Sequence, residues 1–310
     1  MTPPRSATVL VNPAARGVAQ RVDSSRLMRY LSRQGVEARL AIPPSPLEAT
    51  REAEQAGKRG DELLFVVGGD GSVRDAALGL AGSDTALAAV PAGTVNIWAK
   101  EAGIPRRVRA AVDAHLHGQS VHMDLGRAGE QCFLLMAGIG WDAEIARRVP
   151  MWLKRHVGDL AYMTQAAWML PRLRPRHACW TAGADAFEKP LAWMVLGNTR
   201  LYGGRIQLTP EAAIDDGQLD LIAFCPEDIF DGARLAAKLG IGNFSGDSNV
   251  IEGRAREVRI ETPGLAVQLD GDFVGETPMT FRSEPGALLV SVPSGPLSPI
   301  FAREHVDRRG

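Results

Sequence analysis

Residues 66–75 read VVGGDGSVRD: a hydrophobic strand runs into the glycine turn 68–72 and then into a helix-compatible stretch. Glycines let a backbone approach a bound group closely, and the start of a helix offers N–H groups and a positive dipole end. The carboxylate of Asp70 would repel a bare phosphate, so it favours a nucleotide triphosphate with Mg²⁺. The spacing matches neither G-x-G-x-x-G nor the Walker pattern, and taken alone the stretch could be a tight turn.

The first 125 residues alternate strand and helix signals. Apolar runs predict strands at 8–11, 36–42, 63–67 and 86–90, and helical spacing predicts helices at 18–31, 47–55, 73–80 and 107–115. Strands that alternate with helices indicate βαβ units, a parallel sheet and ligands at the carboxyl ends of the strands. The sequence therefore predicts an α/β domain here.

After residue 121 the strand signals follow one another with few helices between them. The predicted strands are 121–125, 132–137, 178–182, 192–196, 219–224, 258–260, 266–269 and 288–292. Only the segments 142–170 and 229–239 read as helical. This pattern predicts a second, antiparallel β-rich domain.

Composition narrows the class of protein. A chain of 310 residues is longer than a typical single core, which favours two domains. The net charge of -1 gives no general attraction to nucleic acid, so we predict no nucleic-acid partner. Three widely spaced cysteines indicate a reducing compartment without a disulfide framework. Without a signal-peptide pattern or an apolar run of about 18 residues, the sequence predicts a cytoplasmic protein with no transmembrane segment.

Two further turns follow predicted strands in the same way. Residues 90–96 read VPAGTVN and residues 12–17 read NPAARG. Thr94 can donate to a phosphate or cap a helix, and Asn96 can bind a phosphate or a polar headgroup. Alone, each is an ordinary helix cap or an Asn-Pro turn. Because neighbouring parallel strands end at one sheet edge, the set favours a nucleotide site, with Arg16 near phosphate.

In order and spacing these loops resemble the diacylglycerol kinase catalytic-domain family of bacterial lipid kinases. Further motifs of that family occur at 136–144 (MAGIGWDAE), 197–204, 210–212, 215–220 (DDGQLD) and 269–272 (LDGD). The resemblance covers nearly the whole chain. It implies a Rossmann-like nucleotide-binding domain at 1–125, a β-sandwich domain at 126–290, a catalytic cleft between them, and a tail at 291–310 that returns to the first domain.

The resemblance also implies the substrates and the residues that bind them. The implied ATP contacts are Asn12, Pro13, Ala14, Arg16, Gly17, Gly68, Gly69, Asp70, Gly71, Ser72, Val73, Arg74, Asp75, Gly93, Thr94 and Asn96. The acceptor would be a hydroxyl of diacylglycerol or a related lipid at the inner membrane surface. The sequence is compatible with a homodimer and leaves the oligomeric state open.

The implied proton acceptor is Asp272, with Asp270 beside it and Asp70 organising the Mg²⁺–phosphate geometry. A carboxylate near the γ-phosphate can accept the proton of a lipid hydroxyl during in-line transfer. Asp-Gly at 270–271 is also a strong hairpin signal, and both interpretations can hold together.

The family's Mg²⁺ site corresponds to Asp216 with the carbonyl oxygens of Ala213 and Gln218. Such oxygen-only ligands suit Mg²⁺, although Asp-Gly at 216–217 equally predicts a β-turn. Asp124 matches an acidic position that joins a metal–water network with the aspartate of the first turn.

Five positions depart from the family pattern. Ser72 replaces Thr, Arg74-Asp75 replaces Asn-Glu, Ile97 replaces an Asp, and Asp272 replaces Glu. The alternative to an active kinase is therefore a non-catalytic or weakly active nucleotide or lipid sensor of the same fold. NAD kinases share the GGDG turn, but their G-x-L-G-F-L stretch is missing after Val90.

Two other features have competing interpretations. Residues 147–177 mix tryptophans and arginines. The helical part fits a core-facing helix, whereas the end at 168–176 favours contact with an anionic membrane. His115, His117 and His122 lack nearby ligand partners, so we expect solvated histidines at a helix end rather than a metal site.

Overall fold

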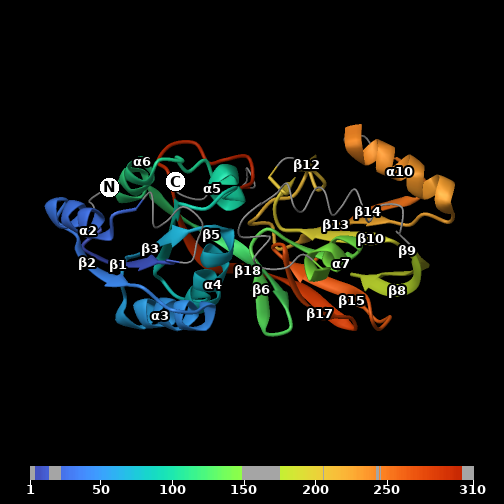
Figure 1. Cartoon of the computed structure of the whole chain (residues 1–310), viewed down its shortest axis with the longest axis horizontal. Coiled ribbons are helices and arrows are strands. Elements are labelled where there is room, and N and C mark those ends of the chain that lie inside the picture. The colour runs from blue at the N-terminus through green and yellow to red at the C-terminus, as the bar shows by residue number, and fades with distance from the viewer. Residues whose placement is uncertain are drawn as a thin grey trace. The chain divides into compact units, whose positions relative to one another are not determined.

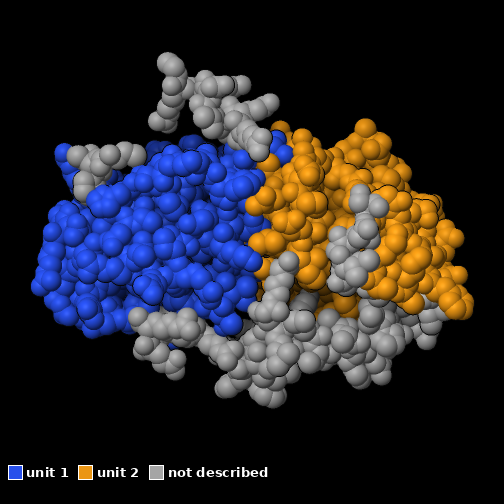
Figure 2. Space-filling view, turned by 90° about the horizontal axis from the view of Figure 1, so that it is seen from above, with its two compact units in different colours: residues 1–125, 214–216, 285–310 blue, residues 126–213, 217–284 orange. Residues whose placement is uncertain are grey.

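The computed structural model describes residues 4–13, 22–148, 175–204, 206–241, 244 and 246–301. The chain divides into two compact units (Figure 2). Unit 1 comprises residues 1–125, 214–216 and 285–310, and unit 2 comprises residues 126–213 and 217–284. Two long strands, β5 (Gln119–Ala128) and β18 (Met279–Val292), therefore run from one unit into the other.

Unit 1 is built on a parallel sheet. Its strands are β1 (Ser6–Val11), β2 (Glu37–Ala41), β3 (Leu63–Gly68) and β4 (Ala86–Pro91), and the order β2-β1-β3-β4 continues into the end of β18. Every residue of β3 and β4 is buried, as expected for the central strands of a sheet covered on both faces. The predicted α/β class is confirmed.

Helices separate these strands along the chain. They are α2 (Ser24–Arg33), α3 (Pro46–Arg59), α4 (Asp70–Leu80), α5 (Ile97–Glu101) and α6 (Val108–Leu116). Figure 1 shows α3 and α4 on one face of the sheet and α6 on the other. The Asp23 side chain caps α2 by accepting from the N–H of Arg26 at 2.9 Å, so α2 begins at Ser24. Residues 18–21 of the predicted helix lie outside the described residues. No helix in the described parts of the chain is long and apolar enough to cross a membrane.

Unit 2 contains two antiparallel sheets. One has the order β14-β13-β10-β7-β16-β17, with bounds β14 (Val250–Ala255), β13 (Leu219–Phe224), β10 (Trp193–Gly197), β7 (Met136–Gly140), β16 (Ala266–Leu269) and β17 (Asp272–Glu276). In the other, the first half of β18 is followed by β15 (Glu257–Ile260), β8 (Arg176–Ala182) and β9 (Asp185–Leu191). Buried side chains from both sheets, such as Met194 and Phe281, form one core, which confirms the predicted sandwich.

Two strands differ from the sequence prediction. The run 132–137 is divided into β6 (Gln131–Phe133) and β7, because the N–H groups of Leu134 and Leu135 bind the Asp270 carboxylate. The run 288–292 extends back to Met279 as part of β18. The pair Pro285-Gly286 is typical of the end of a strand. The Asp124 carboxylate, however, accepts from the N–H of Gly286 at 2.7 Å and keeps the strand continuous.

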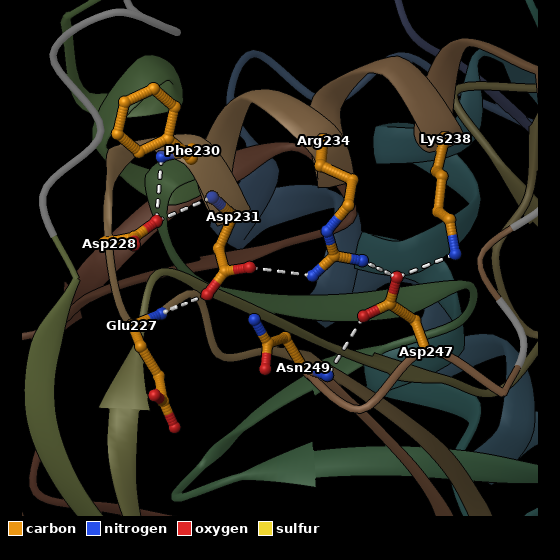
Figure 3. Close-up of polar contacts among 8 residues, drawn as sticks. All are labelled: Glu227, Asp228, Phe230, Asp231, Arg234, Lys238, Asp247 and Asn249. Carbon is orange, nitrogen blue, oxygen red and sulfur yellow. Dashed lines mark hydrogen bonds and ion pairs between the residues drawn. The ribbon is translucent and has the colours of Figure 1, made fainter.

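Helix α10 (Ile229–Ile241) of unit 2 carries a local ion-pair network (Figure 3). Asp247 accepts from Lys238 at 2.7 Å and from Arg234, and Arg234 also pairs with Asp231 at 2.9 Å. The hydrogen bond from Lys238 is the main cause that lowers the pKa of Asp247 to about 2. Both cations of this helix are therefore neutralised within the unit.

His115 differs from the expected solvated histidine. It is 3% exposed, whereas His117 and His122 are exposed. Its Nε2 lies 2.8 Å from the carbonyl oxygen of Ala89, which can only accept, so Nε2 carries the proton and Nδ1 accepts from Ser291 Oγ at 3.0 Å. Burial lowers the pKa of His115 to about 4. The apolar spacing of α6 turns this residue toward β4.

Candidate functional site

The first glycine turn lies at the carboxyl end of β3, as the sequence predicts. Gly69 precedes the first turn of α4, and the buried Ser72 lies in that turn. The side chain of Asn12, at the end of β1, donates to Ser72 Oγ at 2.9 Å. A Cβ at Gly68 would lie 2.5 Å from Ser72 Oγ, so only glycine fits where strand and helix meet.

The turn after β4 is in direct contact with the first. The N–H groups of Ala92 and Gly93 donate to the carbonyl oxygen of Gly68 at 2.9 and 3.2 Å. A Cβ at Gly93 would lie only 2.8 Å from Gly69 Cα. The cavity lined by both turns is about 10 Å³, about the space of one water molecule. Two glycines therefore allow the turns to pack against each other, as expected for neighbouring parallel strands.

Asp70 joins the two turns. Its carboxylate oxygens accept from the N–H groups of Ile97 and Trp98 at 2.9 and 3.0 Å, so it caps α5 from outside that helix. Asn96 has a φ of 54° and exchanges two hydrogen bonds with Gly93, at 3.0 and 2.9 Å. The two candidate polar residues of these turns are thus part of one hydrogen-bonded structure.

The remaining predicted nucleotide contacts lie in different settings. Arg74 pairs with the neighbouring Asp75 at 3.7 Å, and Val73 is buried. Thr94 is exposed in the second turn. Apart from its chain neighbours and the backbone of its own helix, no described residue has an atom within 4 Å of a Cβ position at Gly71. Three predicted contacts, Ala14, Arg16 and Gly17, lie outside the described residues. Most of the segment 147–177 does too, including residues 168–174 of the predicted membrane contact.

In unit 2, the predicted hairpin turn connects β16 to β17. Asp270 and Gly271 have φ values of 49° and 87°, and Leu269 pairs with Asp272 across the turn. Such a two-residue turn with two positive φ values is the type that Asp-Gly favours. The Asp270 carboxylate accepts from the N–H groups of Leu134, Leu135 and Met136, at 2.9, 2.9 and 3.0 Å. Asp272 follows as the half-buried first residue of β17.

A buried carboxylate behind this turn was not among the predicted site residues. Asp142 is 0% exposed, and its Oδ2 accepts from Gln268 Nε2 at 2.9 Å and from the Tyr202 hydroxyl at 3.2 Å. Burial raises its pKa to about 6, against the opposing effect of these hydrogen bonds. The family motif at 136–144, which contains Asp142, is the only sequence signal for this residue. Its partners are too distant in the chain for spacing to reveal them.

The predicted metal ligands lie in a loop from Ala213 to Gln218. The N–H of Ile214 donates to the carbonyl oxygen of Ile300 at 2.8 Å, and Gly217 has a φ of 77°. Asp216 is half-buried. No three His, Cys, Asp or Glu side chains converge among the residues that the structure describes. One carboxylate with two carbonyl oxygens is nevertheless a donor set that fits Mg²⁺.

Asp124, the other predicted participant in the metal network, is a buried residue of β5. Its N–H donates to the carbonyl oxygen of Ile214 at 2.7 Å, and its Oδ1 accepts from the N–H of Gly286 at 2.7 Å. Asp124 therefore connects three separate segments of unit 1.

Two family models match the chain. Residues 6–128 match the diacylglycerol kinase catalytic domain, and residues 136–292 match the YegS C-terminal NAD kinase beta sandwich-like domain. A crystal structure of a putative diacylglycerol kinase from Bacillus anthracis has the same fold, with a TM-score of 0.77 and 20% identity over 95% of this chain and 97% of that chain.

Several relatives match the chain over most of their length. The chain is 32% identical to a diacylglycerol kinase of Mycobacterium tuberculosis (92% of this chain, 94% of the relative) and 27% identical to that of Bacillus subtilis (89% and 93%). It is 33% identical to a probable YegS-like lipid kinase of Pseudomonas putida (82% and 84%). The fold and motifs define a two-domain kinase-type chain. This protein belongs to the family of bacterial diacylglycerol kinases and YegS-like lipid kinases.

Proposed function

We propose that this protein is an ATP-dependent lipid kinase that phosphorylates a hydroxyl of diacylglycerol or a related lipid. The supporting observation is the pair of contacting glycine turns, at 68–72 and 93–96, in a chain of this family. The first turn begins α4, whose dipole favours phosphate, and no described residue outside α4 lies within 4 Å of a Cβ position at Gly71. We place the reaction at the cytoplasmic membrane surface, where ATP meets a lipid.

We assign different roles to four aspartates. Asp272 accepts the proton of the lipid hydroxyl. The oxygen of that hydroxyl bonds to the γ-phosphorus as the bond from this phosphorus to the β–γ bridging oxygen breaks, which releases ADP. Asp270 is a poor base because it already accepts three N–H groups, so it holds the turn. Asp70 holds the two nucleotide turns together through α5. Asp216 with the carbonyl oxygens of Ala213 and Gln218 would hold Mg²⁺, which offsets phosphate charge.

A labelling assay tests this function. Purified protein with Mg²⁺ and γ-labelled ATP is expected to label lipid in mixed micelles that contain diacylglycerols and long-chain alcohols. Asp272→Asn should lower kcat by about 10²- to 10⁴-fold, as expected for loss of a general base. Asp185→Asn is the matched control, because Asp185 also follows a two-residue hairpin turn, paired with Ala182. Absence of labelled lipid from the wild type, or full activity of Asp272→Asn, would contradict the proposal.

One observation favours a nucleotide sensor instead. Both oxygens of Asp70 accept backbone N–H groups, and the arginine at position 74 pairs with its neighbour. Calorimetry with ATP separates the two functions: ATP binding without turnover on the same lipid panel favours the sensor.

A further inference from the structure

The Asp270–Gly271 turn is held by polar contacts on two sides. On one side, the Asp270 carboxylate accepts three backbone N–H groups from residues 134–136. On the other side, the Gly271 N–H donates to Gln268 Oε1. The residue that follows, Asp272, is the base of the proposed reaction. Its position therefore depends on what fixes the Gln268 side chain.

Asp142 fixes the orientation of Gln268. The amide oxygen of Gln268 faces a donor, the Gly271 N–H, so its amide nitrogen is the atom that donates to Asp142 Oδ2 at 2.9 Å. A flipped amide would place donor against donor and acceptor against acceptor. Gln268 is 2% exposed, so water cannot readily replace either partner.

Asp142 is itself held in place. The Tyr202 hydroxyl donates to the same Oδ2, and a Cβ at Gly138 would lie 2.0 Å from Oδ2 and 2.4 Å from Gln268 Nε2. The side chains of Asp142 and Gln268 thus fill the space that a side chain at Gly138 of β7 would occupy. Because burial raises its pKa, the charged Asp142 weakens the fold at neutral pH, so stability alone does not explain a carboxylate here.

We propose that Asp142 and Gln268 are positioning residues, which hold the Asp270–Gly271 turn so that Asp272 is correctly placed to accept the substrate proton. This inference rests on the proposed kinase function. The chain of contacts runs Tyr202, Asp142, Gln268, Gly271, and ends one residue before Asp272. A displacement of about 1 Å at a catalytic group lowers rates by about 10²-fold, which is the effect that loss of this chain should produce.

The test compares two buried substitutions in the same hairpin. Gln268→Met keeps the side-chain volume and removes the amide. Thr277→Val is the matched control: Thr277 is 4% exposed, and its hydroxyl accepts from Leu265 N–H at 3.0 Å and donates to the Thr262 carbonyl at 2.5 Å, at the opposite end of the hairpin. Hydrogen exchange at Gly271 and steady-state kinetics are measured for both variants.

For Gln268→Met we expect exchange at Gly271 at least about tenfold faster, a kcat about 10²-fold lower, and a KM for ATP within about twofold of the wild type. Thr277→Val should change neither Gly271 exchange nor kcat. Wild-type kcat in Gln268→Met, or an equal loss of kcat in both variants, would overturn the inference. A wild-type protein that is inactive on all lipids would instead contradict the proposed kinase function. In that case hydrogen exchange at Gly271 tests the contact by itself: unchanged exchange in Gln268→Met would show that Gln268 does not hold the turn.

A second variant covers poor folding of Gln268→Met. Gln268→Glu keeps the shape and the oxygen for Gly271 but lacks the donor toward Asp142, and at pH 8 the two carboxylates repel. We expect a lower kcat at unchanged KM for ATP at pH 8. A wild-type kcat at this pH would contradict a role for the contact with Asp142.

Discussion

Asp270 and Asp272 lie two residues apart in one hairpin, yet their surroundings differ. Asp270 adopts a φ of 49°, which few residues other than Gly, Asn and Asp tolerate, and its carboxylate satisfies three backbone N–H groups. Asp272 is a half-buried strand residue beyond the turn. The two acids should therefore separate stability from activity.

We predict that Asp270→Ala lowers the free energy of unfolding by about 3 kcal/mol or more, because three N–H groups lose their acceptor and alanine is strained at this φ. Asp272→Asn should change it by less than about 0.5 kcal/mol. Urea denaturation of both variants measures the difference. Similar stabilities for the two variants would contradict the structural role of Asp270.

Gly138 offers a second prediction at this scale. Its missing side chain leaves room for Asp142 and Gln268, so Gly138→Ala should lower the free energy of unfolding by about 1–3 kcal/mol through overpacking. Gly253→Ala in β14 of the same sheet is the control, since a Cβ there has no atom within 4 Å. Thermal unfolding of both variants is the measurement, and equal effects would show that the space at Gly138 is not required.

At the residue scale, the sequence predicts what local chemistry determines. Asp-Gly at 270–271 indicates a hairpin turn, and the structure contains it. The contact between Asp142 and Gln268 joins positions 126 residues apart, so no spacing rule could reveal it. The burial of His115 was likewise missed, because it depends on Ala89 and Ser291 in separate strands.

Among the elements, the central strands were predictable, whereas of the edge strands β2 was predicted and β9, β14 and β17 were not. Strands β3, β4 and β13 are buried throughout, so their apolar runs are visible in the sequence. Strands β9 and β14 lie at sheet edges and expose half or more of their residues, so the usual apolar signal is missing. Helix α5 was missed because it has only five residues and takes its cap from another helix.

The capping of α5 by Asp70 of helix α4 gives a prediction for α5. Asp70→Ala removes the acceptor for the N–H groups of Ile97 and Trp98, and loss of a helix cap typically lowers stability by about 1–2 kcal/mol. We expect faster hydrogen exchange at these two amides and weaker ATP binding, since the cap joins both nucleotide turns. Asp23→Ala, which uncaps α2, is the control for a cap elsewhere in unit 1. Unchanged exchange at Ile97 and Trp98 would contradict this role.

Across the whole molecule, each unit contains a buried group whose pKa is strongly shifted by desolvation. In unit 1, burial lowers the pKa of His115 from 6.5 to about 4. In unit 2, burial raises the pKa of Asp142 from 3.8 to about 6. Each shift corresponds to roughly 3 kcal/mol at about 1.4 kcal/mol per pH unit. The two contributions to stability have opposite pH dependence.

The signs follow from proton binding. Between about pH 4 and 6.5, His115 binds a proton in the unfolded chain but not in the folded one. The contribution of His115 to the free energy of unfolding is therefore present above pH 6.5 and is lost as the pH falls toward 4. Between about pH 4 and 6, folded Asp142 holds a proton that the unfolded residue has released. Its contribution is therefore present below about pH 4 and is lost as the pH rises through 6.

Substitutions that cannot titrate should separate these effects. His115→Gln can keep a donor for Ala89 and an acceptor for Ser291, so the stability of the wild type relative to this variant should fall by up to roughly 3 kcal/mol from pH 7 to pH 4. The stability of the wild type relative to Asp142→Asn should rise by a similar amount over the same range. Denaturant unfolding at several pH values, referred to each variant, removes the titration of other carboxylates. A difference of the same sign for both variants would contradict the assigned burial of one group, because desolvation shifts an acid and a base in opposite directions.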